Sequence, residues 1–137
     1  SVGVGASGVH ECDELAANPL DPDRVSAGIR SQFINPSKAI FACEDAVSSF
    51  PAELRFQFQL GRAYRQDGKY IEAIRWYRSA AVGGYAGAQN SLGVMYALGE
   101  GLIKDCNKAA YWIGLAAVQL YPAAIRNLNN LRCTELV

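Results

Sequence analysis

Four arginines could bind carboxylate groups, and they carry the clearest chemistry in the sequence. Each lies in a run whose apolar residues recur at helical spacing, at Arg55, Arg62, Arg65 and Arg126. A guanidinium group binds a carboxylate through two parallel hydrogen bonds, which fixes the geometry of both groups. These arginines therefore indicate a binding surface for acidic groups.

A helical period of 3.6 residues places further side chains on the same predicted face as the arginines. Amide and apolar side chains fall on this face, whereas no acid does. We predict that it forms a concave groove for a segment of a partner protein, with arginines holding carboxylates and amides holding the backbone. The predicted partner-binding residues are Arg55, Phe58, Arg62, Arg65, Gln66, Asn90, Val94, Leu98, Arg126 and Asn130.

Other interpretations of these arginines stay open. One alternative is that the arginines are solvated surface groups in an accidental pattern. Another is that Arg55 pairs with Glu53 or Glu72 and is neutralised. A glycan ligand is also open, because arginine and aromatic side chains contact sugars as well as peptides.

Catalytic chemistry has little support in the sequence. A nucleophile needs a positioned base, and the single histidine, His10, stands near the start of the chain. The carboxylates of Glu53, Glu72, Glu100 and Asp105 share no helical phase that would pair two of them. We therefore predict no enzyme activity, no cofactor and no metal.

The cysteines Cys12, Cys43, Cys106 and Cys133 predict disulfides. No two of them have the short spacing of a zinc site, and four cysteines allow three pairings. The expected helices favour Cys106–Cys133, because the start of one helix meets the end of its antiparallel neighbour, and this leaves Cys12–Cys43. Such bridges occur in oxidising compartments. Four buried free thiols are the alternative.

The elements that must position these groups are helices. Pro36 after Asn35 and Asp105 before Cys106 are typical helix starts, and two prolines break the chain between residues 18 and 23. Residues 24–35 are expected to be irregular. Apolar spacing predicts helices over residues 9–17, 36–50, 52–67, 70–83, 86–98, 105–119 and 121–134.

A repeat relates these helices. Leu60-Gly61, Leu92-Gly93 and Leu128-Asn129 recur with a period near the 34 residues of tetratricopeptide repeats. The glycines, which lack a Cβ, are expected to let a partner helix approach closely. We predict an all-α, right-handed solenoid of antiparallel helical hairpins with capping helices at both ends. Its expected parts are a flexible tail over 1–8, a capping segment over 9–50, and two hairpins with a C-terminal capping helix over 51–134.

A family resemblance supports the repeat. The string Ala88–Tyr96, followed by Gly99-Glu100-Gly101, Asp105 and Trp112, resembles a Sel-one-like repeat, a cousin of the tetratricopeptide repeat, and the likeness covers about residues 52 to 131. It implies an adaptor scaffold in protein complexes, in bacterial signalling or in host contact. Residues 12–24 resemble the leader segment of bacterial secreted or periplasmic repeat proteins, which implies that location.

Composition limits the partners. Thirteen basic and thirteen acidic residues balance in the 137-residue chain, so no overall charge attracts nucleic acid or an anionic membrane. No apolar run approaches the roughly 18 residues needed to span a bilayer. We predict a non-catalytic adaptor that binds a peptide segment of a partner protein. The alternatives are a regulatory module of a larger enzyme such as a peptidase, and a homo-oligomer that stacks through Ala123, Ile125 and Leu128.

Overall fold

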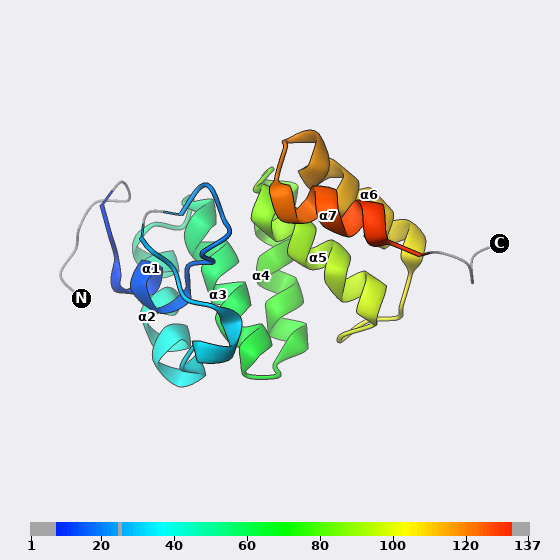
Figure 1. Ribbon diagram of the computed structural model, residues 1–137. Helices are drawn as coiled ribbons and strands as arrows, with labels where there is room; N and C mark the ends of the chain where they lie inside the picture. The colour runs from blue at the N-terminus through cyan, green and yellow to red at the C-terminus, as the bar shows by residue number, and fades with distance from the viewer. Residues whose placement is uncertain (1–7, 25, 133–137) are drawn as a thin grey trace. The chain divides into compact units, whose positions relative to one another are not determined.

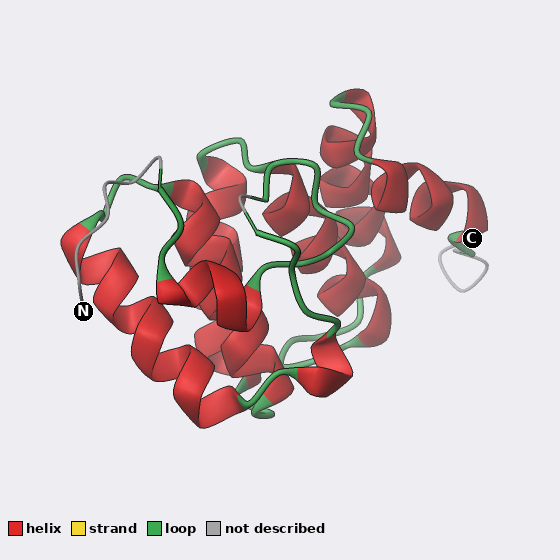
Figure 2. Cartoon of the chain, turned by 60° about the vertical axis from the view of Figure 1, so that its left-hand side comes forward, coloured by secondary structure: helices red, strands yellow, loops and turns green. Residues whose placement is uncertain are grey.

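The computed structural model describes residues 8–24 and 26–132, and over these residues the chain forms helices and loops with no strand (Figures 1 and 2). The predicted all-α class is confirmed for this part of the chain. The helices are α1 (Glu11–Ala16), the 3₁₀ turn η1 (Ser31–Phe33), α2 (Pro36–Ser49), α3 (Leu54–Gln66), α4 (Tyr70–Val82), α5 (Ala86–Leu98), α6 (Cys106–Val118) and α7 (Pro122–Asn130).

Local capping sets several of these boundaries. The Asn35 side chain accepts from the Lys38 backbone N–H at the start of α2, where Pro36 is the first helical residue. Asp105 caps α6 in the same way, through the Lys108 N–H, and Gly99 ends α5 in the left-handed conformation at φ 70°. The Asp105 cap agrees with the helix start that the sequence predicted at this residue.

The last helix is shorter than predicted. The sequence predicted a helix over 121–134, but α7 ends at Asn130 and the backbone of Leu131 is extended at φ −68° and ψ 128°. Residues 31–33 also form a short 3₁₀ turn inside a stretch that was expected to be irregular. The predicted tail lies outside the described residues except for Gly8.

The chain divides into two compact units, Ser1–Trp76 and Tyr77–Val137. In the first unit, α1 packs against α2 and α3, and α2 packs against α3. The predicted capping segment, residues 9–50, thus shares a core with α3. That core is built from small and aromatic side chains, namely Cys12, Ala16, Ile34, Ala39, Cys43, Ala46, Phe56, Leu60 and Ala63.

In the second unit, α5 and α6 pack closely as a helical hairpin, and α7 packs against α6. Gly93 lies at a close contact between α5 and α6. A Cβ built on Gly93 would stand 2.5 Å from Ile113 Cγ1 and 3.0 Å from the Ala109 carbonyl oxygen. The expectation that Gly93 admits a neighbouring helix is therefore confirmed. The right-handed solenoid stays a prediction.

Tyr64 links α3 to α2 in the first unit. Its hydroxyl donates to Glu44 Oε2 over 3.2 Å. Burial, and then the negative charge of Glu44, raise the pKa of Tyr64 above its ordinary value of 10.0. The fold therefore favours the neutral phenol.

We expect Gly93→Ala to lower the free energy of unfolding by roughly 1–3 kcal/mol, because the added methyl group overpacks the contact with α6. Gly114→Ala is the matched control, since Gly114 also lies in a helix but has no atom within 4 Å of a built Cβ. That control should be neutral or stabilising by about 0.5–1 kcal/mol. Urea unfolding of both variants measures the difference, and equal midpoints would contradict the assigned close approach.

We expect stability to fall with rising pH once Tyr64 begins to ionise in the unfolded chain, near its ordinary pKa of 10.0. Because the pKa is raised in the folded chain, the native state then holds more protons than the unfolded state, and the loss continues through the folded pKa. Phenolate absorbance of wild type minus Tyr64→Phe isolates this group. Glu44→Gln should lower the pKa of Tyr64 but leave it raised, because burial is the larger cause; a wild-type Tyr64 titrating at or below its ordinary value would contradict the contact.

Candidate functional site

Two of the predicted binding arginines, Arg55 and Arg62, hold residues of their own chain. They are only 5% and 6% exposed, and both reach from α3 to the N-terminal segment of the first unit. We call residues 8–34, which contain α1 and η1, the N-terminal segment.

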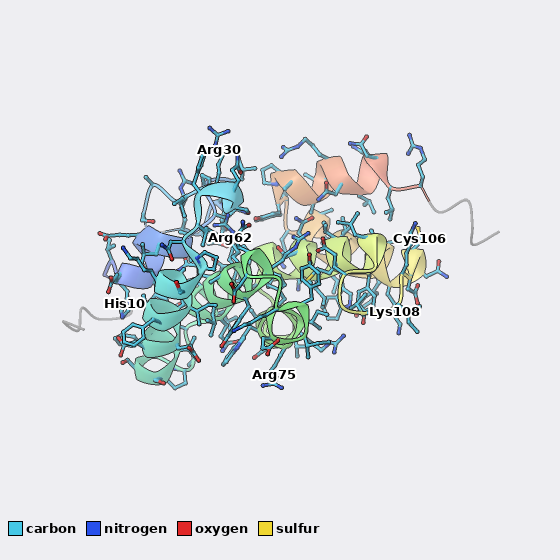
Figure 3. The ribbon with its side chains drawn as sticks, turned by 90° about the horizontal axis from the view of Figure 1, so that it is seen from below. His10, Arg30, Arg62, Arg75, Cys106 and Lys108 are labelled. Atoms are coloured by element: carbon cyan, nitrogen blue, oxygen red, sulfur yellow. A yellow bond between two sulfur atoms is a disulfide. The ribbon has the colours of Figure 1, made fainter. Side chains whose placement is uncertain are left out.

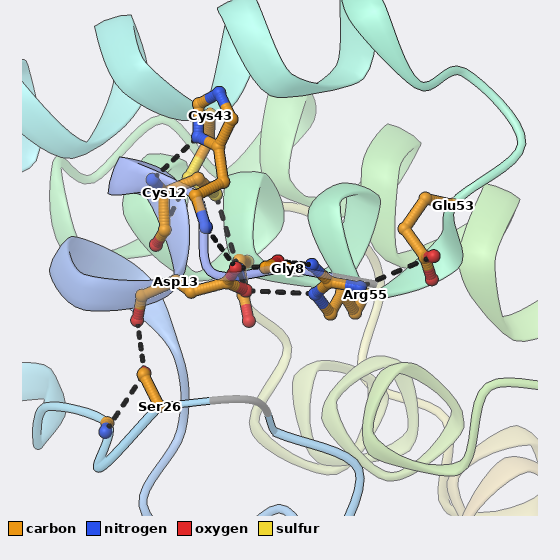
Figure 4. Close-up of polar contacts among 10 residues, drawn as sticks. Gly8, Cys12, Asp13, Ser26, Cys43, Glu53 and Arg55 are labelled. Carbon is orange, nitrogen blue, oxygen red and sulfur yellow. Dashed lines mark hydrogen bonds and ion pairs between the residues drawn. A yellow bond between two sulfur atoms is a disulfide. The ribbon is translucent and has the colours of Figure 1, made fainter. Parts of the chain in front are cut away.

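Arg55 binds the carboxylate of Asp13 in α1 with the geometry expected of a guanidinium group (Figure 4). Its Nε donates to Oδ1 over 3.0 Å and its Nη2 donates to Oδ2 over 3.2 Å. Nη2 also donates to the Gly8 carbonyl oxygen over 2.8 Å, and Nη1 lies 3.3 Å from Glu53 Oε2. The chemistry predicted for Arg55 is therefore present, but the acid belongs to the same chain. The alternative pairing with Glu53 is present as well.

Asp13 is fully buried, and several donors satisfy it. Besides the two bonds from Arg55, it accepts from Gln59 Nε2 over 3.0 Å and from the His10 backbone N–H over 2.8 Å. The His10 ring in turn caps α1, with Nδ1 accepting from the Cys12 N–H over 3.0 Å. Charge-assisted bonds of this kind are about twice as strong as neutral ones, so α1 is held firmly against α3.

A disulfide makes a second connection to α1. Cys12 in α1 is bonded to Cys43 in α2, at a sequence separation of 31 residues. This confirms one of the two predicted pairings. Cys106 is buried and disulfide-bonded, and its predicted partner, Cys133, lies outside the described residues.

Arg62 holds the later part of the N-terminal segment. Its Nη1 donates to the Ala16 carbonyl oxygen over 2.7 Å, and its Nη2 donates to the Ile29 carbonyl oxygen and to Ser31 Oγ, each over 3.0 Å. One guanidinium group thus joins the end of α1 to the start of η1. The loop between these elements is fixed at both ends.

These contacts correct part of the predicted groove. Arg55, Phe58 and Arg62 were expected to project outward, but Phe58 has no exposed surface and both arginines are buried. For the arginines the reason is direct, because the N-terminal segment covers their side of α3. Farther along α3, Arg65 is partly exposed and Gln66 is exposed.

The predicted residues of the second unit have a different environment. Asn90 is 9% exposed and accepts at Oδ1 from Asn127 Nδ2 of α7 over 3.0 Å. Farther along α5, Val94 is partly exposed and Leu98 is 60% exposed. The exposed Arg126 and Asn130 lie on α7. We define the α5–α7 face as Asn90, Val94, Leu98, Arg126, Asn127 and Asn130.

A cavity of about 430 Å³ lies beside Arg62 in the first unit. Sequence analysis identified only Arg62 among its lining residues. The others come from the loop after α1 and from η1, and no helical phase connects these stretches. The lining residues are Asn18, Pro19, Leu20, Arg30, Ser31, Gln32 and Arg62.

The structure gives no support for a metal site or a membrane-spanning helix in the part of the chain that it describes. Among the residues that it describes, no three histidine, cysteine, aspartate or glutamate side chains are grouped as metal ligands. No helix in the same part of the chain has both the length and the apolar character to cross a membrane. The sequence matches no protein-family model and no curated protein.

We expect Asp13→Asn to lower the free energy of unfolding by roughly 3–5 kcal/mol, because it removes the buried carboxylate that pairs with Arg55 and leaves only the partly exposed Glu53 beside that charge. Glu14→Gln removes the same charge from the next, exposed position of α1 and should change stability little. Denaturant unfolding with the disulfide intact compares the two. A similar, small effect of both substitutions would show that the Arg55–Asp13 pair is not essential to this unit.

Proposed function

We propose that this chain is a non-catalytic protein-interaction module that binds a segment of a partner protein on the α5–α7 face. The observation that carries the proposal is the way in which α3 holds the N-terminal segment. Arg55, Gln59 and Arg62 bind a carboxylate, backbone carbonyl oxygens and a hydroxyl of that segment. One face of a helix in this fold is therefore suited to holding a peptide.

The sequence repeat relates positions on α3 of the first unit to positions on α5 and α7 of the second unit. Counted from the recurring leucine, Phe58 and Arg62 of α3 correspond to Asn90 and Val94 of α5, and to Arg126 and Asn130 of α7. In α3 the two positions are buried, whereas in α7 both are exposed. On the α5–α7 face, the counterpart positions on α7 are therefore accessible to a ligand.

The side chains of this face suit a peptide that carries an acid. Asn127 and Asn130 have amide groups, which can donate to and accept from a peptide backbone. Val94 and Leu98 supply apolar contact, and Arg126 supplies a positive charge that favours an acidic side chain. The resemblance of residues 52–131 to Sel-one-like repeats is consistent with a role as an adaptor.

The Cys12–Cys43 disulfide supports an oxidising compartment for the proposed module. Together with the leader-like residues 12–24, it leads us to propose the periplasm of a bacterium, or secretion from it, as the location. Self-association is the second candidate function. It is favoured by Ile125 and Leu128 on α7, which are apolar and each 39% exposed.

We expect synthetic acid-rich peptides to bind more tightly than versions in which every acid is replaced by its amide. Arg126→Glu should weaken the acid-rich peptide about tenfold, because it replaces an attractive charge by a repulsive one. Leu98→Ser should weaken both peptide versions. Lys38→Glu, at an exposed position of α2 in the first unit, is the control and should bind like wild type.

Fluorescence anisotropy with labelled peptides measures these affinities, and sedimentation at several concentrations reports the mass. Absence of binding by every peptide at about 1 mM would contradict the proposal. Equal affinities of wild type and Arg126→Glu for the acid-rich peptide would also exclude the α5–α7 face as its binding site. A mass that rises with concentration and is lost with Leu128→Ser would favour self-association.

A further inference from the structure

The cavity beside Arg62 shares no lining residue with the α5–α7 face, and all of its lining residues belong to the first unit. Arg30 stands at the start of η1 and Arg62 on α3, and Figure 3 labels both. The volume of about 430 Å³ falls in the range of small-ligand sites, about 300–1,000 Å³. The loop that forms its wall is fixed by the bonds from Arg62 to Ala16 and Ile29.

Hydrogen bonds within the chain determine which polar groups remain for a ligand. Asn18 Oδ1 accepts from the Leu20 N–H over 3.0 Å, which leaves the Asn18 NH₂ group to donate. Ser31 Oγ accepts from Arg62 Nη2 over 3.0 Å, which directs the hydroxyl hydrogen of Ser31 elsewhere. In both residues an acceptor is therefore engaged by the chain itself, and a donor is left.

The charged residues at the cavity also favour a ligand that accepts hydrogen bonds. Arg30 is exposed, and its guanidinium group lies 5.7 Å from the centre of the Phe33 ring. A cation–π contact does not require an N–H···O hydrogen bond, so the N–H groups of Arg30 can still bind a ligand. Arg62 adds a second cation to the lining, and none of the described residues that line the cavity carries a carboxylate.

Apart from Gln32, whose amide group can donate or accept, the remaining wall of the cavity is apolar. Pro19 and Leu20 line the cavity, and Leu20 is 60% exposed. A ligand that matches both parts of the lining needs a negatively charged hydrogen-bond acceptor and an apolar group.

We propose that this cavity binds a carboxylate attached to a small apolar group. The carboxylate accepts hydrogen bonds from Arg30, Ser31 and Asn18, and the apolar group packs on Pro19 and Leu20. A free organic acid and the C-terminal residue of a peptide share this chemistry. Because the site does not involve α5 or α7, the proposal does not depend on the function proposed above.

The first experiment compares N-acetyl-leucine with N-acetyl-leucinamide, which has the same apolar body but no charge. Amide chemical shifts in two-dimensional NMR spectra report both affinity and place. The acid should bind and shift the signals of residues 18–20 and 30–32, whereas the amide should bind at least about tenfold more weakly. A tetrapeptide ending in leucine, tested with a free and with an amidated C-terminus, distinguishes the two ligand sources: binding of the free tetrapeptide assigns a peptide C-terminus, and its exclusion assigns a free acid.

Arg30→Gln is the test variant, because it removes an exposed charge from the cavity without removing a bond that fixes the loop. It should weaken N-acetyl-leucine about tenfold. Arg75→Gln is the matched control, since it removes the same charge from an exposed position of α4 and should leave the affinity unchanged. Arg126→Glu should also leave it unchanged, so failure at this cavity is distinguishable from failure at the α5–α7 face. Equal binding of acid and amide, an unaffected Arg30→Gln variant, or shifts confined to other residues would overturn the proposal.

Discussion

The buried ion pair between Arg55 and Asp13 is the contact on which the arrangement of the first unit depends. Removing two charges from water costs several kcal/mol for each ion, so the pair is tolerated only where geometry and further hydrogen bonds compensate. Here they do, because the two guanidinium bonds are joined by donors from Gln59 and His10. The Cys12–Cys43 disulfide acts on the unfolded chain instead, and in the chain-entropy model a loop of this length stabilises by about 4 kcal/mol. The two links are thus complementary. The ion pair determines where α1 lies on α3, and the disulfide limits how far α1 can move away from α2.

Once α1 is fixed, the rest of the N-terminal segment follows. Arg62 donates to the backbone carbonyl oxygens of Ala16 and Ile29, and these bonds hold both ends of the loop close to α3. The loop does not fill all of the space beside it, and the cavity is what remains. Arg62 engages the acceptor of Ser31, and the Leu20 N–H engages the acceptor of Asn18, so both residues keep a hydrogen-bond donor at the cavity. A ligand site for a carboxylate is therefore a consequence of how the segment is fastened.

The two units use related helices in different ways. In the first unit, the predicted binding positions Phe58 and Arg62 of α3 are buried, and the N-terminal segment covers Arg62. In the second unit, the corresponding positions on α7 are exposed, and on α5 Val94 is partly so. This difference supports the proposed adaptor role, because the second unit has exposed positions that a partner can contact. It also separates the two proposals physically, since one depends on α5 and α7 and the other on the loop after α1.

The sequence by itself determined the features that rest on local physics. Helical spacing located the helices, capping residues such as Asp105 located their ends, and the missing Cβ of Gly93 marked a close helix contact. The Cys12–Cys43 pairing was also predicted. Only the tertiary structure decided that Arg55 and Arg62 are buried, because helical phase gives the side of α3 on which they lie but not which distant segment covers it. The cavity was beyond sequence analysis for the same reason: Asn18, Arg30 and Arg62 lie on three separate stretches, and only long-range contacts, with the hydrogen bonds they engage, bring these groups together.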